Sequence, residues 1–386
     1  MNKVKVSIAK ARDYDCAQVR AALEKAIGLI GGLQDVLKPG AKVFVKINHL
    51  PPPSPAERGI VTHPVFVEGV LQLLKDFTTD ITVGDDIESS GEDGFRVSGF
   101  RQMCERAGVR LINLKEAGFI ETYCNGHFLE KIYLSRIALE ADIVINLPKL
   151  KTHSLTVFTG GVKNMYGTIP NSFRKKFHGE YVSNEDFSHV LTDIFSTVIP
   201  QLTIMDGIVA MEGEGPSSGS LRRVGIILAS ADAVALDAVA TKIIGMEPMD
   251  IYTTRYSDRR GLGIGNLENI EVVGESITDV SVPDFRPPAS AMNALLKKVP
   301  RFLSRLVVGQ LSVKPQIIEA KCNSCAECER ICPTTAISMC GKAAKINYTI
   351  CIKCMCCHET CRFDAIMPSL PVGGRILYFL NKAFRL

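Results

Sequence analysis

The chain has 386 residues, of which 46% are hydrophobic and 22% charged, and its formal net charge is +4. This length accommodates one large domain with a small one, or two medium domains, each with its own core. The small net charge argues against nucleic acid as a partner, and no apolar run reaches the length of a membrane span.

The first 285 residues alternate β-branched runs with helical patterns, which is typical of a parallel sheet with crossover helices. We therefore expect an α/β domain over residues 1–285, built on a mostly parallel, doubly wound sheet in one or two lobes. Its expected strands include residues 4–10, 42–48, 80–86, 141–147, 202–211, 224–230 and 270–274, and its expected helices include residues 16–33, 63–77 and 233–245.

Residues 286–312 are expected to form a linker and a basic amphipathic helix. Prolines break both periodicities between residues 281 and 290, and residues 292–311 are apolar and basic without an acidic residue. Residues 373–386 form a second amphipathic segment of the same character. Packing of both segments on the body of the protein is the favoured interpretation, and peripheral contact with a membrane surface is the alternative.

Ten of the thirteen cysteines fall between Cys322 and Cys361. Such clustering indicates metal ligation in a reducing compartment rather than a disulfide framework. The amino-terminal residues also lack the apolar core of a signal peptide. We therefore expect a cytoplasmic protein.

These cysteines form two runs with the spacing C-x2-C-x2-C-x3-C, offset by 29 residues. Bacterial two-cluster ferredoxins have this pattern, and the fourth cysteine of each run ligates the other cluster. Zinc is disfavoured, because its usual sites are built from two C-x2-C pairs. The sequence therefore predicts two 4Fe-4S clusters, one held by Cys322, Cys325, Cys328 and Cys361 and the other by Cys351, Cys354, Cys357 and Cys332.

Residues 313–372 thus resemble bacterial two-cluster ferredoxins, which implies a small α+β domain and single-electron transfer. The segment departs from that pattern at Arg362, which follows the last cysteine where the first half has Pro333. This difference is expected to alter the local turn and to leave ligation intact. Cys340 and Cys356 are additional thiols that we do not assign as ligands.

A basic stretch over residues 143–179 contains Lys149, Lys151, Lys163 and the three basic residues 174–176, without any aspartate or glutamate. The stretch follows a predicted strand, and open α/β sheets bind their ligands outside the carboxyl ends of strands. Glycine turns beside the lysines favour an anion-binding site. The alternative is a solvated basic surface.

Six motifs resemble the family called domain of unknown function 362: VKIN at 45–48, THP at 62–64, GDD at 84–86, LPKLKTH at 147–153, GGVKNMYG at 160–167 and MDGIVAMEGEGP at 205–216. This resemblance covers nearly the whole chain. Proteins of that family often carry a two-cluster ferredoxin segment. The resemblance therefore implies an iron–sulfur protein of redox metabolism whose reaction the family name does not state.

The polar residues of these motifs are the candidate site residues. The candidate catalytic residues are His153, Lys149, Lys151, Lys163 and Asp206, and the candidate substrate-binding residues are Lys46, Asn48, His63, Asp85, Asn164 and Glu212. The lysines would hold a carboxylate or a phosphate. The pKa of His153 is expected to be lowered by the lysines around it, which would leave a neutral imidazole for acid–base work near pH 7.

Three local interpretations accompany these candidates. His63 has two equally supported interpretations, as a residue of the site and as the cap of the helix that follows it. Asp206, Glu212 and Glu214 are expected on a glycine-rich loop, where they would bind a metal or form salt bridges with the lysines. Residues 261–266, GLGIGN, are expected to form an ordinary loop rather than a dinucleotide-binding turn.

Three functions remain open. The first is a ferredoxin-linked oxidoreductase or its electron-donating partner, which exchanges electrons with a carrier protein and acts on a small anionic substrate. The second is a non-enzymatic electron-transfer protein whose α/β domain is a docking surface. The third is a non-redox isomerase or hydrolase in which the clusters have only a sensing or a structural role. A shaped pocket around His153 would favour an enzyme, and a flat basic surface would favour docking.

Overall fold

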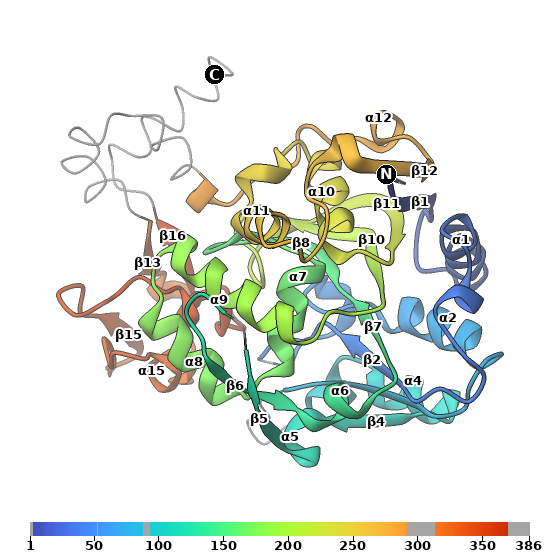
Figure 1. The fold of residues 1–386 in the computed structure, drawn as a ribbon. Helices are drawn as coiled ribbons and strands as arrows, with labels where there is room; N and C mark the ends of the chain where they lie inside the picture. The colour runs from blue at the N-terminus through green and yellow to red at the C-terminus, as the bar shows by residue number, and fades with distance from the viewer. Residues whose placement is uncertain (1–2, 52, 88–92, 125, 292–312, 370–386) are drawn as a thin grey trace.

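The computed structural model describes residues 3–51, 53–87, 93–124, 126–291 and 313–369 (Figure 1). The basic amphipathic segment over residues 292–311 and the carboxyl-terminal segment over residues 373–386 lie outside these ranges. Within the described part of the chain, none of the helices combines the length and the apolar character needed to cross a bilayer.

One ten-stranded sheet forms the centre of the α/β domain, in the order β12-β1-β11-β10-β7-β2-β3-β4, with β8 pairing with β10 and β9 with β8. Its pairs are parallel except β1 with β11, β10 with β11 and β8 with β9. The prediction of a large, mostly parallel α/β sheet is confirmed. The strands are β1 (Val4–Lys10), β2 (Val43–Ile47), β3 (Ile81–Asp85), β4 (Arg110–Asn113), β7 (Ile143–Leu147), β8 (Lys149–His153), β9 (Val157–Thr159), β10 (Leu202–Glu212), β11 (Ser220–Ser230) and β12 (Ile270–Gly274).

Helices cover both faces of this sheet. Along β2, Val43 and Val45 pack in a core with α1 and α2, whereas Phe44 packs in a second core with α9. This division follows from the two-residue period of a strand. The helices are α1 (Cys16–Leu29), α2 (Pro64–Leu74), α3 (Gly94–Val97), α4 (Phe100–Ala107), α5 (Leu114–Ala117), α6 (Arg136–Glu140), α7 (Gly161–Asn164), α8 (Asn171–Glu180), α9 (Asn184–Thr197), α10 (Ala233–Ile243), α11 (Tyr252–Arg259) and α12 (Ile277–Val280), and a hairpin of β5 (Phe119–Tyr123) and β6 (Lys131–Ser135) lies apart from the main sheet.

Two local expectations are confirmed. The helix α2 begins at Pro64, and His63 is its N-cap, with Nδ1 accepting a hydrogen bond from the backbone N–H of Val65 at 3.3 Å. Residues 261–266 form a loop that follows α11, so they do not link a strand to a helix as a dinucleotide-binding turn would.

Asp206 and Glu212 do not lie on a glycine-rich loop, whereas the expected strand over residues 202–211, which contains Asp206, is confirmed. Both residues lie in β10, which pairs with β11 in a long antiparallel hairpin up to the pair Glu212 and Ser220. The loop begins only after Glu212. The hairpin prevails because nearly all side chains of β10 are buried, which extends the strand past its glycine and its carboxylates.

The α/β domain continues slightly beyond residue 285. The guanidinium Nε of Arg286 lies 2.8 Å from Oε1 of Glu212, and the backbone N–H of Ala289 donates to Glu214 at 2.9 Å. The start of the segment expected as a linker is therefore anchored by the two glutamates of the β10–β11 loop region. Glu212 pairs with an arginine there, and not with a lysine of the basic stretch.

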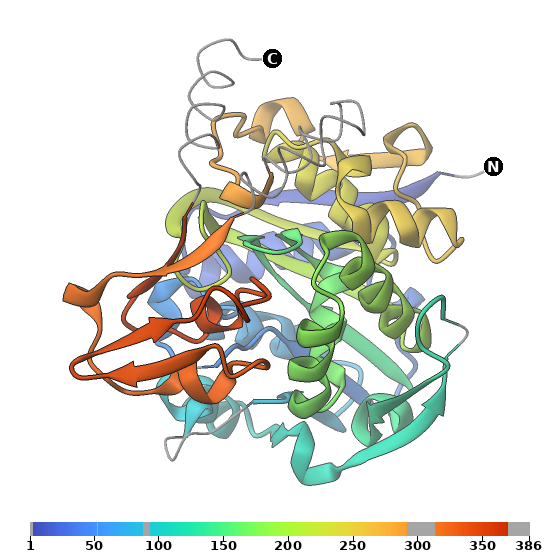
Figure 2. The same ribbon diagram turned by 90° about the vertical axis from the view of Figure 1, so that its left-hand side faces the viewer.

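Residues 313–369 form a small α+β unit that lies against the α/β domain (Figures 1 and 2). Two antiparallel pairs build it, β13 with β16 and β14 with β15. The two short helices precede β14 and β16, so each half of the unit has the same order of elements. The elements are β13 (Lys314–Ile317), α15 (Glu327–Ile331), β14 (Ile337–Cys340), β15 (Ala343–Ile346), α16 (Cys356–Glu359) and β16 (Ile366–Ser369).

Candidate functional site

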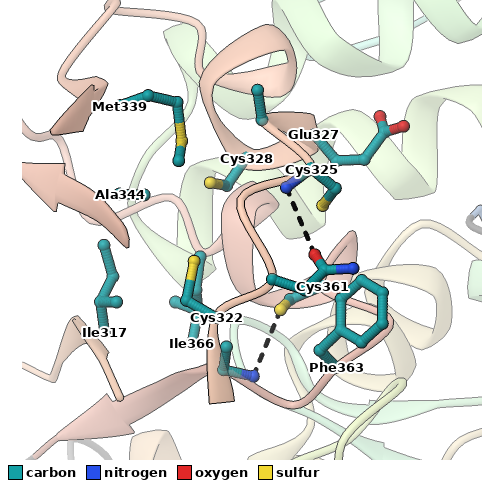
Figure 3. A pocket seen from close by; sticks show the side chains of 13 residues that line it. Ile317, Cys322, Cys325, Glu327, Cys328, Met339, Ala344, Cys361, Phe363 and Ile366 are labelled. Carbon is teal, nitrogen blue, oxygen red and sulfur yellow. Dashed lines mark hydrogen bonds between the residues drawn. The ribbon is translucent and has the colours of Figure 1, made fainter. Parts of the chain in front are cut away.

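Four cysteines line one cavity of the carboxyl-terminal unit. They are Cys322, Cys325, Cys328 and Cys361, and Figure 3 shows their sulfur atoms around a common space. The first three come from the loop before α15 and from α15 itself, whereas Cys361 follows α16. Apolar side chains of β13, β14, β15 and β16, which are Ile317, Met339, Ala344 and Ile366, also line this cavity.

A second cavity is lined by Cys332, Cys351, Cys354 and Cys357. Here the last three cysteines come from the loop before α16 and from α16, and Cys332 follows α15. Each cavity thus gathers three cysteines of one run and the fourth cysteine of the other run. This is the same division into two sets that the spacing of the sequence predicts.

The two halves of the unit also share an unusual backbone. Six residues other than glycine have left-handed φ angles between 50° and 64°, and they fall at matching positions of the two halves. Such a conformation costs free energy in an L-residue and persists only where the surroundings impose it. Successive amides in turns of this kind point inward and form a concavity for anions. The six residues are Ser324, Ala326 and Thr335 in the first half and Lys353, Met355 and Asp364 in the second.

A backbone amide donates to one cysteine sulfur in each half. The N–H of Ala336 donates to Sγ of Cys332 at 3.2 Å, and the N–H of Ala365 donates to Sγ of Cys361 at 3.3 Å. The expectation that Arg362 alters the second turn is wrong, because both turns keep this bond and the left-handed residue before it. The proline of the first half is therefore not needed for the shape of the turn.

The two additional cysteines have different surroundings. Cys356 is buried and lines the second cavity beside the predicted ligands, whereas Cys340 is exposed at the end of β14. Among the residues that the structure describes, no three His, Cys, Asp or Glu side chains meet the geometry of a site for one metal ion. Of the two additional thiols, Cys356 is the one that shares a cavity with predicted ligands.

Three of the candidate catalytic residues lie on β8, which is not among the strands expected from the sequence. Lys149, Lys151 and His153 alternate with Leu150 and Thr152, so they share one face of the strand. Their exposed fractions are 2%, 0% and 0%. The alternative of a solvated basic surface is therefore wrong for these residues.

Two candidate lysines have a buried carboxylate partner. Nζ of Lys46 lies 2.9 Å from Oδ2 of Asp85, and Nζ of Lys149 lies 2.8 Å from Oδ2 of Asp206. The hydroxyl of Tyr14 also donates to Asp206 at 2.9 Å. Burial lowers the pKa of both lysines, and the paired carboxylates oppose this shift. These charges are neutralised within the domain.

The glycine turn at residues 160–161 holds an internal carboxylate. The N–H groups of Gly161 and Val162 donate to the two carboxylate oxygens of Asp237 at 2.6 and 3.1 Å. A Cβ atom at Gly160 would lie only 2.2 Å from Asp237. These two amides therefore bind the carboxylate of Asp237 on α10 and are not available to an external anion.

Other candidate binding residues also make internal contacts. The side-chain amides of Asn48 and Asn164 donate to a backbone carbonyl and to another buried asparagine. The ring of His63 stacks on Tyr14 with centroids 3.6 Å apart, and its backbone N–H donates to Asp206 at 3.0 Å. These three motif residues therefore make contacts that hold their own domain together.

A carboxylate of the carboxyl-terminal unit reaches His153, and its charge acts on the remaining lysines. Glu359 is the last residue of α16, and its Oε1 lies 3.3 Å from Nε2 of His153. Burial raises the pKa of Glu359 to about 7, against the opposing charges of Lys163 and Lys151. Burial also lowers the pKa of Lys163 to about 8 and that of Lys151 well below its ordinary value.

The pKa of His153 is lowered well below its ordinary value, as the sequence predicts, but the main cause is different. Burial contributes most, and the charges of Lys163, His178 and Lys151 add to it. The imidazole is therefore neutral near pH 7.

The hydrogen bonds of His153 fix its neutral form. Its Nδ1 accepts from the backbone N–H groups of Leu155 and Thr156 at 3.1 and 3.3 Å. An accepting Nδ1 carries no proton, so the proton of the neutral ring is on Nε2. That proton points to the side on which Glu359 lies.

Further contacts dock the carboxyl-terminal unit beside this site. Arg58 donates to the carbonyl oxygen of Arg362 at 3.1 Å and lies 3.2 Å from Asp364. Nε2 of His358 lies 3.1 Å from the carbonyl oxygen of Glu214. The sequence does not identify Arg58 or Glu359 as site residues, because neither belongs to a motif that carries chemistry by itself.

The match to a protein family falls within the α/β domain. The model of a family described as Domain of unknown function (DUF362) matches residues 43–242, which include the lysine site and end before the cysteine-rich unit. The thylakoid-associated protein sll1697 of Synechocystis sp. is 31% identical over 259 residues, which are 67% of this chain and 79% of the relative.

Solved structures give weaker matches. The lactate racemase apoprotein from Thermoanaerobacterium thermosaccharolyticum aligns with a TM-score of 0.42 and 14% identity, over 60% of this chain and 55% of that chain. A protein from Thermotoga maritima aligns with a TM-score of 0.34 and 13% identity, over 52% of each chain. This chain therefore spans about half the length of either protein, and these scores support no functional argument.

Proposed function

This chain belongs to the family described as Domain of unknown function (DUF362), and because that description states no reaction, we propose a function from the residues of the chain itself. It is an iron–sulfur electron-transfer protein whose carboxyl-terminal unit holds two 4Fe-4S clusters. Its α/β domain binds a small anionic substrate at Lys151, Lys163 and His153. The two parts together act as a ferredoxin-linked oxidoreductase.

The observation that supports the clusters is the distribution of eight cysteines over two cavities. A cubic cluster needs four thiolates that converge from different directions, and each cavity offers three from one loop and a fourth from the other half. Left-handed turns and N–H donors to sulfur surround the thiolates with the positive ends of amides. These residues fit two 4Fe-4S clusters.

When bound, the clusters would supply single-electron transfer, since protein thiolates would occupy every ligand position. Cys357 belongs to the set around the second cavity, and Cys361 belongs to the set around the first. Glu359 lies between them in the chain and reaches His153 in the α/β domain. The residues that connect both cavities to the lysine site are therefore part of one short segment.

The burial of the lysine site favours an enzyme over a flat docking surface. Lys46 and Lys149 are paired with aspartates inside their own domain, so Lys151 and Lys163 are the cations left for a substrate anion. His153 carries its proton on Nε2 and would donate a hydrogen bond to that anion. The same proton would be available for transfer to a reduced substrate.

A non-enzymatic electron-transfer protein is the second candidate, and the position of Glu359 favours it. A carboxylate that faces the lysines of another domain is also what a permanent docking contact would provide. The two candidates differ in whether an external anion binds at the site.

Anaerobic purification of the full chain, followed by EPR of the reduced protein and a thermal-shift screen of small carboxylates and phosphates, tests the proposal. We expect EPR signals of reduced 4Fe-4S clusters and stabilisation by at least one anion. Stabilisation should be lost in Lys163→Gln and kept in the control Lys176→Gln, which alters an exposed lysine of the same basic stretch. Clusters without any anion response would favour the docking protein, and a protein without clusters would contradict both candidates.

A further inference from the structure

Glu359 brings a carboxylate to His153, whose neighbours Lys151 and Lys163 form no ion pair among the described residues. Lys46 and Lys149 have aspartate partners at 2.9 and 2.8 Å within the α/β domain. In the described part of the chain, no α/β carboxylate lies within ion-pair distance of Lys151 or Lys163, and the opposite charge that acts most strongly on each is that of Glu359.

The site also holds more polar groups than Glu359 can satisfy. The buried nitrogen atoms without a hydrogen-bond partner among the described residues include Nε2 of His153, and also Nδ1 of His178 and Nε of Arg174, whose charges act on His153 and Lys163. Oε1 of Glu359 is likewise buried without a hydrogen bond, although it lies 3.3 Å from His153. Buried polar groups in native proteins are nearly always bonded, so these atoms point to a ligand that completes the site.

The contact of Glu359 favours a carboxylate as the ligand. Its own carboxylate lies 3.3 Å from Nε2 of His153, so the site already accommodates a group of this kind. Asp85 and Asp206 neutralise Lys46 and Lys149, which leaves Lys151 and Lys163 to attract the anion.

We propose that Glu359 occupies the position of the ligand's carboxylate, and that a small carboxylic acid anion binds to Lys151, Lys163 and His153 in its place. This inference rests on the anion site of the proposed function and names its ligand class. Because two carboxylates cannot share the site, ligand binding and the contact of α16 with the α/β domain exclude each other. The ligand therefore weakens the docking of the carboxyl-terminal unit, and docking weakens the ligand.

Removal of the resident carboxylate tests this inference. Glu359→Ala deletes a CH2–COO⁻ group, which acetate can replace. We expect acetate to bind the full-length, cluster-loaded variant at least about tenfold more tightly than the wild type, since a competitor that fills the site most of the time reduces the apparent affinity by that factor. Calorimetric titration with acetate, formate and inorganic phosphate measures this, with iron content as a check on loading.

Three comparisons make the result specific. Glu319→Ala removes an exposed carboxylate of the same unit and should bind acetate as the wild type does. Glu359→Ala combined with Lys163→Gln should lose the gain. Glu359→Gln keeps the size of the side chain, so it gives the same test if the alanine variant does not fold, and it should also bind acetate more tightly than the wild type.

Equal acetate affinity in the wild type and both Glu359 variants would overturn the inference, and so would a preference of the variants for phosphate. Either result leaves the anion site and the clusters of the proposed function intact if the wild type binds another anion and contains iron. Absence of iron from the wild type overturns the proposed function instead, whatever the acetate titration shows.

Discussion

Oε1 of Glu359 lies 3.3 Å from Nε2 of His153, and these atoms belong to different domains. The sequence places Glu359 between two predicted cluster ligands and His153 on a strand of the α/β sheet. Their contact joins the cysteine-rich unit to the strand that carries the buried lysines Lys149 and Lys151. The proposed electron transfer and anion binding would therefore take place beside one interface, and several measurable consequences depend on it.

Crosswise ligation predicts that cysteine substitutions do not add independently. The double variant Cys322→Ser with Cys361→Ser removes two ligands of one predicted cluster and should keep about four irons per chain. The double variant Cys322→Ser with Cys332→Ser removes one ligand of each and should lose nearly all iron. Iron and sulfide analysis of anaerobically purified protein measures both. If each run held its own cluster, the two results would be exchanged.

Cys356 provides a control for ligand assignment. It is buried in the second cavity, but the eight-cysteine pattern leaves no ligand position for it. We expect Cys356→Ser to keep the iron content of the wild type. Loss of about four irons in this variant, at unchanged protein yield, would contradict the assignment of Cys351, Cys354, Cys357 and Cys332.

The buried pair of Lys46 and Asp85 should be important for stability. Both side chains are almost fully buried and lie 2.9 Å apart, and Lys46→Met would leave the carboxylate uncompensated. We expect a loss of about 3–5 kcal/mol in the free energy of unfolding. The matched change Lys176→Met removes an exposed pair with Glu180 at 3.8 Å and should cost less than about 1 kcal/mol. Chemical denaturation compares the two, and similar losses would contradict the buried pairing.

Buried histidines predict a loss of stability in acid. Burial, with the charges of Lys163 and Arg174, lowers the pKa of His178 to about 3, whereas an unfolded histidine has a pKa of about 6.5. Between these values the unfolded chain binds more protons than the folded one, so the free energy of unfolding falls as the pH falls below about 6.5 and is unaffected by this group above it. The slope per group is about 1.4 kcal/mol per pH unit.

When the pH is lowered from 7 to 5, the free energy of unfolding of His178→Gln should therefore rise by about 2 kcal/mol relative to that of the wild type. The control His127→Gln replaces an exposed ring and should follow the wild type. Thermal unfolding at a series of pH values measures the difference between each variant and the wild type. A difference for His178→Gln that stays constant with pH would show that this histidine does not titrate as its burial requires.

The sequence predicts those parts of the protein that local pattern determines. Alternating runs predict the parallel α/β sheet, and the spacing from Cys322 to Cys361 predicts which cysteines share a cavity. Both patterns are short-range consequences of backbone period and loop geometry. The start of α2 at Pro64, after the N-cap His63, is another feature that local pattern determines.

The sequence fails where tertiary packing overrides local polarity. Residues 149–153, KLKTH, are not among the expected strands, yet they form β8, because Lys149 pairs with Asp206 and Lys151 donates to a backbone carbonyl. A buried lysine cannot be anticipated from hydrophobic periodicity, which assigns charged residues to the surface. Glu359 is missed for a related reason, since its partner lies in another domain and depends on how the two domains dock.

The clusters are the central claim, and metal analysis of the anaerobically purified full chain tests it most directly. We predict about eight irons and eight acid-labile sulfides per chain, with EPR signals of reduced 4Fe-4S clusters after treatment with dithionite. Stoichiometric zinc, or iron far below about eight per chain with no such signals, would contradict the account.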